Sequence, residues 1–148
     1  MRKLLKAYTT LEVLVVIGII MLISTMVVPV SIRQTKLNEL TIAGRNLYSH
    51  IFVQQQNAFS GKNDLNHGIY VEQEGFWLFQ GDNFNDADVK EYFTIGKGIE
   101  VVSGNTEIVF PKGSQKPTDE TSIVLTFANN NYVILINEQG VIDSYVQN

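Results

Sequence analysis

The chain has 148 residues, a formal net charge of −4 and no cysteine. This length suits one modest domain with an accessory element, and the lack of thiols excludes disulfides, thiolate metal sites and cysteine nucleophiles. The acidic balance and the lack of a basic stripe argue against a nucleic-acid-binding surface.

The first element along the chain is an apolar run at residues 13–32. These 20 residues carry no charge, and as a helix they would reach about 30 Å, the thickness of the hydrocarbon core of a bilayer. A secretory signal has a shorter apolar region, of about 7 to 15 residues, followed by a small-residue cleavage site. We therefore predict a helix that is retained in the membrane and contacts membrane lipid.

Basic residues lie on both sides of this run. They are Arg2, Lys3 and Lys6 before it, and Arg33 and Lys36 after it. Because the short amino-terminal side carries most of these cations, the positive-inside rule places that side in the cytoplasm and residues 33–148 outside. The predicted location is that of a single-pass inner (cytoplasmic) membrane protein.

Glu12 and Pro29 lie near the two ends of this segment, and each has an ordinary structural interpretation. Thr9 and Glu12 have the T-x-x-E spacing of a capping box, and a carboxylate near a helix start interacts favourably with the helix dipole. Pro29 is tolerated as a kink in a membrane helix, because neighbouring groups satisfy the carbonyl that it frees. Taken separately, neither residue requires a special function.

Taken together, the first 32 residues resemble the amino terminus of type IV pilins and of the pseudopilins of type II secretion and DNA-uptake machines. That family has a short basic leader, a cleavage point, an aromatic first mature residue, a Glu fifth after the cut and frequently a Pro at the twenty-second mature position. Here residues 1–7 match the leader, Tyr8 matches the first mature residue, and Glu12 and Pro29 match the other two positions. All of these features fall in one register.

The resemblance implies a processing step and a set of partners. A prepilin peptidase and methyltransferase would cut between Ala7 and Tyr8, where the family usually has Gly and Phe, and would methylate the new amine. Loss of the leader would remove three cations and take the formal charge from −4 to −7. The protein would then be drawn into an extracytoplasmic filament with other pilin or pseudopilin subunits by assembly-platform and motor proteins.

The resemblance also gives Glu12 a role in assembly. A carboxylate in an apolar environment is costly unless it is paired. The family implies that Glu12 would pair with the amine of Tyr8 on an adjacent subunit and set the axial register. Pro29 is the second residue that the resemblance connects with assembly.

After the apolar run, the pattern becomes that of an amphipathic helix that ends near Phe59. Its apolar positions recur at three- and four-residue steps, which is typical of one buried helix face. These positions are Leu37, Leu40, Gly44, Leu47, Ile51 and Ala58. Gly61, in the polar stretch that follows, is the predicted cap.

From Gly68 onward the pattern has a period of two, which indicates strands. The predicted strands are 68–72, 76–79, 91–95, 99–102, 107–110, 122–127, 132–136 and 141–145. A tight turn at 73–75 predicts a hairpin, and breaks at 129–131 and 137–140 predict a meander. The polar loop 112–118 is predicted to be exposed and available for partner contacts.

These elements predict an α+β protein with a long N-terminal helix, transmembrane and then amphipathic, packed against an antiparallel β-sheet head. One face of a single sheet is expected to cover the helix. The expected organisation is a leader at 1–7, a transmembrane and polymerisation helix at 8–32, an amphipathic helix at 33–60 and a β head at 61–148. Among pseudopilins, this number of strands is most similar to the minor H-type (FimT-like) heads.

No catalytic constellation is found in the sequence, so an enzyme is not predicted. His50 and His67 lie in different elements and lack metal-ligand spacing, which favours a surface or capping role. Asp82, Asp86 and Asp88 are the only candidate metal ligands, for calcium. Their spacing departs from the EF-hand pattern and lacks its closing Glu, so a solvated loop with Asx-turns is the favoured interpretation, without a cofactor.

The aromatic residues Tyr70, Trp77, Phe79 and Tyr92 alternate with polar residues on predicted strands. Stacking of single-stranded DNA on them is one interpretation, but phosphate contacts normally dominate such affinity and no basic groove is predicted. Core packing is therefore favoured for these side chains. The alternative to a filament subunit is a membrane-anchored binding module for DNA or for a secreted substrate.

Overall fold

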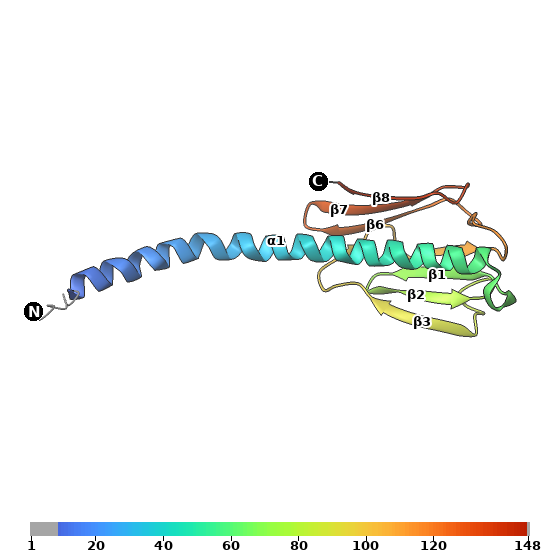
Figure 1. Ribbon diagram of the computed structural model, residues 1–148, viewed down its shortest axis with the longest axis horizontal. Helices are drawn as coiled ribbons and strands as arrows, with labels where there is room; N and C mark the ends of the chain where they lie inside the picture. The colour runs from blue at the N-terminus through green and yellow to red at the C-terminus, as the bar shows by residue number, and fades with distance from the viewer. Residues whose placement is uncertain (1–8, 148) are drawn as a thin grey trace, which may run out of the picture. The chain divides into compact units, whose positions relative to one another are not determined.

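The computed structural model describes residues 9–147, without the side chains of residues 25–33 in the helix. The chain divides into two compact units, residues 1–36 and 37–148. The helix α1 spans Thr10–Phe59 and contributes to both units, and the short 3₁₀ helix η1 spans Lys62–Asp64. Figure 1 labels α1 and most of the strands.

The first unit consists of the amino-terminal part of α1. A reciprocal capping box begins the helix: the Thr9 backbone N–H donates to Glu12 Oε2 (3.4 Å), and the Glu12 backbone N–H donates to Thr9 Oγ1 (3.3 Å). The predicted capping box is thus confirmed. The helix continues through Pro29. Within the described residues, no helix combines the length and the apolarity that crossing a membrane requires.

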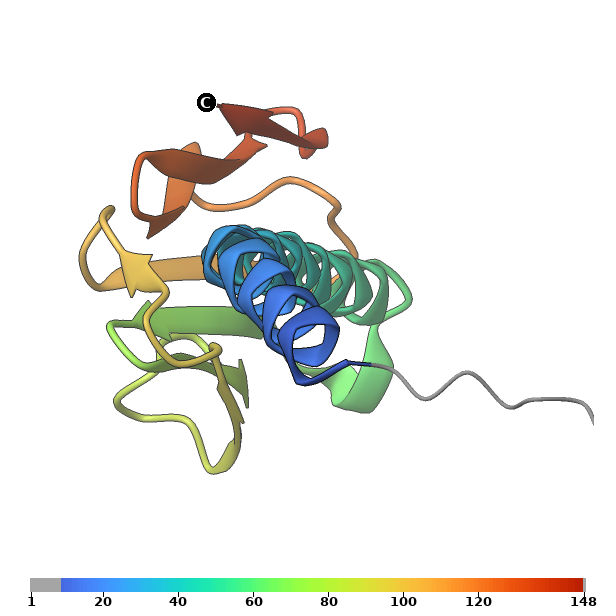
Figure 2. The same cartoon turned by 90° about the vertical axis from the view of Figure 1, so that its left-hand side faces the viewer.

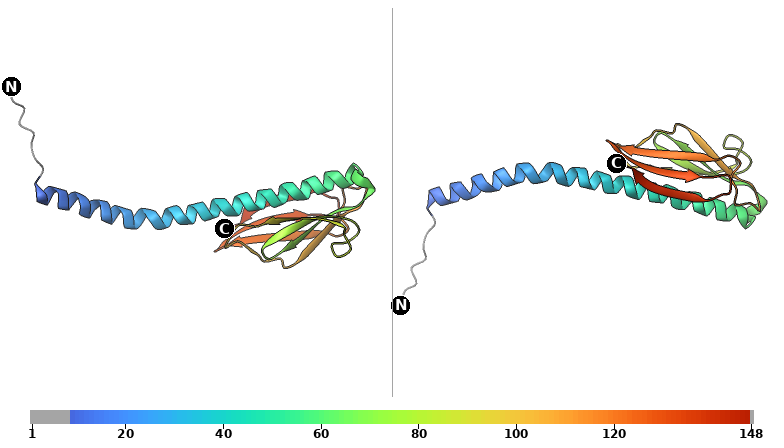
Figure 3. Two further views of the ribbon diagram at one scale, coloured as in Figure 1. Left: turned by 90° about the horizontal axis from the view of Figure 1, so that it is seen from below. Right: turned by 90° about the horizontal axis from the view of Figure 1, so that it is seen from above.

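The second unit is an α+β fold with two antiparallel sheets. Sheet A has the strand order β3-β2-β1-β5, and sheet B has the order β4-β6-β7-β8. The strands are β1 (His67–Glu72), β2 (Gly75–Gln80), β3 (Val89–Thr94), β4 (Glu100–Val101), β5 (Thr106–Phe110), β6 (Thr121–Phe127), β7 (Asn130–Ile136) and β8 (Ile142–Gln147). Sheet A is in front when the unit is viewed from below, and sheet B is in front from above (Figure 3).

The single sheet expected from the sequence is therefore wrong, because the strands divide between two sheets. The physical reason lies in the helix, which presents two neighbouring stripes. On one stripe, the centroid of the His50 ring lies 5.3 Å from the ring centroid of Phe76 and 4.3 Å from that of Phe93, both in sheet A. On the other stripe, Gly44 lies directly under the ring of Tyr132 in sheet B. Each stripe takes its own sheet, as the end-on view shows (Figure 2).

The hydrophobic core lies where the two sheets and the helix meet. Its helical members were all on the predicted apolar face. The largest fully buried apolar side chains are Leu40, Leu47, Ile51, Ile69, Phe79, Ile108, Phe110, Ile123, Leu125, Ile134 and Ile136. Because α1 supplies side chains to this core, the head depends on its helix for burial of apolar surface.

The local predictions for the ends of elements agree with the structure. The helix ends at Phe59, and Gly61 follows with a φ of 67°, a left-handed conformation that glycine adopts without a steric penalty. Glu72 pairs with Gly75, which leaves a two-residue hairpin turn. The strand predicted at 99–102 is shorter than expected, since only Glu100 and Val101 pair with β6.

Candidate functional site

The residues predicted to act in processing and assembly belong to the first unit. Ala7 and Tyr8 lie outside the described residues, and the side chain of Pro29 is among those not described. Glu12 is exposed and forms the capping box with Thr9. Around it, every large apolar side chain from Leu11 to Ile23 is exposed, so that the helix presents apolar surface on all sides.

The acidic loop 82–88 is held by its own hydrogen bonds. The Asp86 backbone N–H donates to Asn83 Oδ1 (2.9 Å), and Asn83 Nδ2 donates to Asp86 Oδ2 (2.9 Å). Asp82 Oδ1 accepts a hydrogen bond from Asn66 Nδ2 (2.8 Å). These bonds agree with the predicted turn built on side-chain oxygens. Across residues 9–147, no cluster of three acidic or histidine side chains suited to a metal ion is found.

His67 is buried, so the surface position considered for it is wrong, whereas a capping role agrees with its contacts. Its Nε2 lies 3.0 Å from the Lys62 carbonyl oxygen. Its Nδ1 lies 3.0 Å from Gln54 Oε1. The ring thus joins the last turns of α1 to the start of β1. His67 is buried because it begins β1, which is an inner strand of sheet A.

His50 is half-buried between α1 and sheet A, and its burial predicts that the stability of the head depends on pH. Burial lowers the pKa of His50 below 6.5, an effect that Glu91 partly offsets. Above about pH 6.5, His50 does not lower the free energy of unfolding. As the pH falls below that value, the unfolded state binds more protons than the folded state, so the free energy of unfolding decreases. We expect His50→Gln to reduce the loss of unfolding free energy between about pH 7.5 and about pH 5.5. Urea titrations that follow the single tryptophan, Trp77, would measure it; equal losses in both proteins would contradict the prediction.

Gln55 fastens two loops to the helix. Its Nε2 donates to the backbone carbonyls of Gln115 (2.8 Å) and Gly140 (2.6 Å), and the side chain is 4 % exposed. The Gly113 N–H also donates to the Ala58 carbonyl (2.8 Å). Loop 112–118 is therefore attached to the helix at several points, although most of its side chains are exposed.

Replacing Gln55 should loosen both of these loops. Gln55→Ala leaves two carbonyls without their donor, which should lower the free energy of unfolding by about 1 to 3 kcal/mol. The neighbouring Gln56→Ala is the matched control, since Gln56 is only partly buried. Urea unfolding followed by Trp77 fluorescence measures both. Equal stability of the two variants would show that the Gln55 bonds contribute nothing measurable.

Aromatic side chains cover the outer face of sheet A. Phe84 folds back and stacks on Tyr70, with ring centroids 4.3 Å apart and planes 6° apart, and Trp77 lies 4.7 Å from Tyr92. Lys90 Nζ lies 4.6 Å from the Phe84 ring centroid. The predicted burial is confirmed only for Phe79, which is 1 % exposed. It is wrong for Tyr70 and Trp77, which are only partly buried, and for Tyr92, which is exposed; their rings pack on one another instead. No sequence pattern predicted the packing of Phe84, because a loop position has no periodicity.

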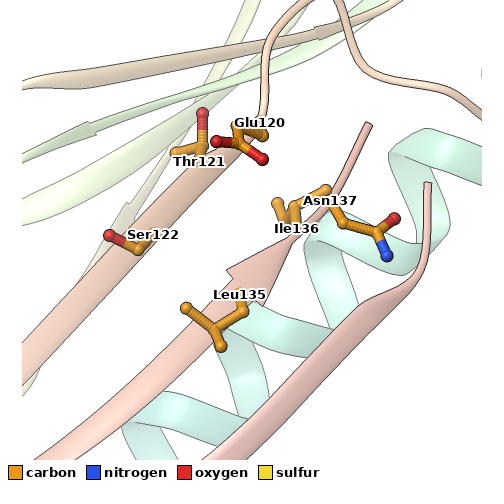
Figure 4. A pocket seen from close by; sticks show the side chains of 6 residues that line it. All are labelled: Glu120, Thr121, Ser122, Leu135, Ile136 and Asn137. Atoms are coloured by element: carbon orange, nitrogen blue, oxygen red, sulfur yellow. The ribbon is translucent and has the colours of Figure 1, made fainter. Parts of the chain in front are cut away.

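Several open cavities lie on the described part of the head, among them the following two. One, of about 360 Å³, is on sheet B, where β6 begins and β7 ends (Figure 4). Its lining consists of Glu120, Thr121, Ser122, Leu135, Ile136 and Asn137, without a histidine or lysine to activate a hydroxyl. The other, of about 650 Å³, runs between the β1–β2 turn and loop 95–99.

Comparisons with known proteins give no further assignment. No protein-family model, no curated protein and no solved structure matches the chain.

Proposed function

We propose that this protein is a structural subunit, a pilin or pseudopilin, of a type IV pilus, a type II secretion pseudopilus or a DNA-uptake filament. It would be made as an inner-membrane protein and cut by prepilin peptidase before Tyr8. Its finer fold assignment would be a pilin-like head on a long helix, similar to the H-type minor pseudopilins. Its work would be mechanical, without chemistry of its own.

The observation that carries the proposal is the apolar surface on every side of α1 in the first unit. Leu11 is 73 % exposed, and the other large apolar side chains up to Ile23 are also exposed. A helix of this kind has no polar face for water, so it requires lipid or other apolar helices around it. In the sequence, the charge-free run at 13–32 has 20 residues, the length expected of a helix that spans a bilayer.

The second unit supplies further apolar surface along the same helix. Ile42, Phe52, Val53 and Phe59 remain between 45 and 58 % exposed. At 100° per residue they fall within an arc of about 120°, on the side of α1 opposite the buried Leu40, Leu47 and Ile51. This stripe supports a role in which helices of neighbouring subunits pack together.

The physical basis of the proposed assembly is the similarity of lipid and helix bundle as environments. Lipid tails are as apolar as leucine side chains, so moving such a helix from a bilayer into a bundle has almost no hydrophobic cost. Helix packing and one paired charge would then decide whether the helix stays in the bilayer or joins the filament. Glu12, at the start of the helix, would supply that charge, and the new amine of Tyr8 on the next subunit would pair with it.

The mass of the mature protein tests the proposal. We expect intact-mass spectrometry of protein from membranes of a host that makes such filaments to show loss of residues 1–7 and a methylated Tyr8 amine. Ala7→Val is the matched control, because the resemblance places a small residue before the cut, and it should keep the leader. Full-length protein that never enters sheared filaments would contradict the proposal and favour a membrane-anchored binding module.

A further inference from the structure

Strand β3 is an edge of sheet A, and its hydrogen-bonding direction follows from the ladder. The Ile95 N–H donates to the Glu74 carbonyl (3.0 Å), and the register pairs Thr94 with Gly75. In an antiparallel ladder, backbone groups alternate between the two sides of a strand. Residues 89, 91 and 93 therefore face β2, whereas the N–H and C=O groups of Lys90, Tyr92 and Thr94 face outward.

These outward groups have no strand beside them. β3 is the last strand of sheet A, with no neighbour on its outer side in Figures 1 and 2. Five of its six residues are exposed. Outside the helices and strand ladders, no backbone hydrogen bond among the described residues involves the N–H of residues 90, 92 or 94. This row of donors and acceptors is a template for another strand.

The other sheet edges are better protected. The Thr118 N–H donates to the Val109 carbonyl (2.9 Å) and covers the edge of β5. The edge strand β4 has only two residues. At β8, the Tyr48 hydroxyl donates to the Ile142 carbonyl (3.5 Å). Lysines on edge strands commonly block pairing, but Lys90 is held on the outer face by Phe84 and by the Asn85 carbonyl (3.2 Å).

A groove continues from the open edge. Its volume is about 650 Å³, and Tyr92 and Thr94 of β3 are among its lining residues. Two carboxylates, Glu74 and Glu100, and one cation, Lys97, also line it. The Tyr92 hydroxyl lies over Gly75, where an added Cβ would be 2.5 Å away. Desolvation and the nearby Glu72 and Glu74 carboxylates raise the pKa of Tyr92.

This lining is suited to a basic side chain. An ammonium or guanidinium group would meet the ring of Tyr92 and the carboxylates of Glu74 and Glu100, as cation–π and ionic contacts require. A second copy of the chain is a poorer occupant. Its own β3 carries one basic residue, Lys90, which Phe84 and the Asn85 carbonyl already hold, and its β8 reads IDSYVQ without a basic residue.

We propose that the open edge of β3 accepts an extended segment of a different polypeptide as an added strand, and that the adjoining groove takes a basic side chain of that segment. Backbone hydrogen bonds would provide affinity, and the groove would provide specificity. The proposal does not rest on filament assembly, because it concerns only the second unit.

The test uses the full-length chain in detergent and a phage-displayed library of linear peptides. We expect enriched peptides to alternate apolar and polar residues and to contain Lys or Arg. Thr94→Pro removes one outward N–H without touching the ladder to β2, and proline is tolerated on such edges. It should weaken peptide binding about tenfold, whereas Thr94→Val, which keeps the N–H, should leave affinity unchanged.

Three further measurements make the test specific. Val146→Pro, the corresponding change on β8, should not affect affinity. Glu74→Gln combined with Glu100→Gln should weaken binding about fivefold and reduce its dependence on salt. On the unaltered chain, bound peptide should slow hydrogen exchange at Lys90, Tyr92 and Thr94, a readout that does not depend on any variant folding.

Several results would overturn the proposal. One is a selection in which the unaltered chain enriches no peptide that the Thr94→Pro variant does not also enrich, while Trp77 fluorescence shows that both proteins are folded. Another is peptide binding without slower exchange at the three outward amides. Self-association that Thr94→Pro abolishes would also overturn it, because the occupant of the edge would then be a second copy.

Discussion

Gly44→Val should destabilise the head by about 3 kcal/mol, near the upper end of the usual cost of overpacking a core. An added Cβ at Gly44 would lie 2.3 Å from Cδ1 of Tyr132 and 2.4 Å from its Cγ. These atoms are at the base of the ring, so they cannot move without displacing β7 from the helix. Urea unfolding monitored through Trp77 would report the loss.

The matched control for this prediction is Gly18→Val. Gly18 also lies in α1, but nothing lies within 4 Å of its added Cβ, so the head should keep its stability. A second check is the double variant with Gly44→Val and Tyr132→Ala. Its loss of unfolding free energy should be smaller than the sum of the losses in the two single variants, because the two side chains compete for one space. Equal stability of Gly44→Val and the unaltered protein would show that β7 does not pack against this turn of the helix.

Glu12→Leu should leave the protein in the membrane but reduce its incorporation into filaments by tenfold or more, about 1.4 kcal/mol of lost pairing free energy or greater. The proposed reason is loss of the carboxylate that would pair with the Tyr8 amine of an adjacent subunit, which leaves that amine unpaired in an apolar surrounding. Quantifying the protein in sheared filaments and in the membrane fraction would measure the effect.

Thr9→Val separates this role from helix capping. Glu12 accepts a hydrogen bond from the Thr9 backbone N–H, and its own N–H donates to Thr9 Oγ1. Thr9→Val breaks the second bond and keeps the carboxylate, so filaments should form normally. If both variants fail to the same extent, Glu12 acts by capping the helix; if both are incorporated equally well, the assembly role is refuted.

Much of the head could be predicted from local patterns. Helix ends depend on nearby residues, so Gly61 and the polar residues after it located the end of α1. Period-two alternation located the strands, and a short turn between β1 and β2 identified their hairpin. The division into two sheets could not be predicted, because β5 pairs with β1, a strand more than thirty positions earlier.

The candidate sites also divide into one that local spacing predicts and one that depends on residues distant in the chain. Thr9 and Glu12 are three positions apart, so their spacing alone predicted the capping box that the structure contains. The groove beside β3 brings together Glu74 from a turn and Tyr92 and Glu100 from two different strands, β3 and β4. No short motif contains these three residues, and only the course of the chain places them side by side.

By itself, the sequence determined the helix, the strands and the apolar surface of the first turns, because these depend on side-chain periodicity and on neighbours a few residues away. Only the tertiary structure decided which strands pair, which sheet each helix stripe contacts and which edge stays open. Those features depend on contacts between residues that are distant in the chain. The strand β3 illustrates the difference, since its pattern predicts a strand and its unpaired outer side follows only from its place at the end of sheet A.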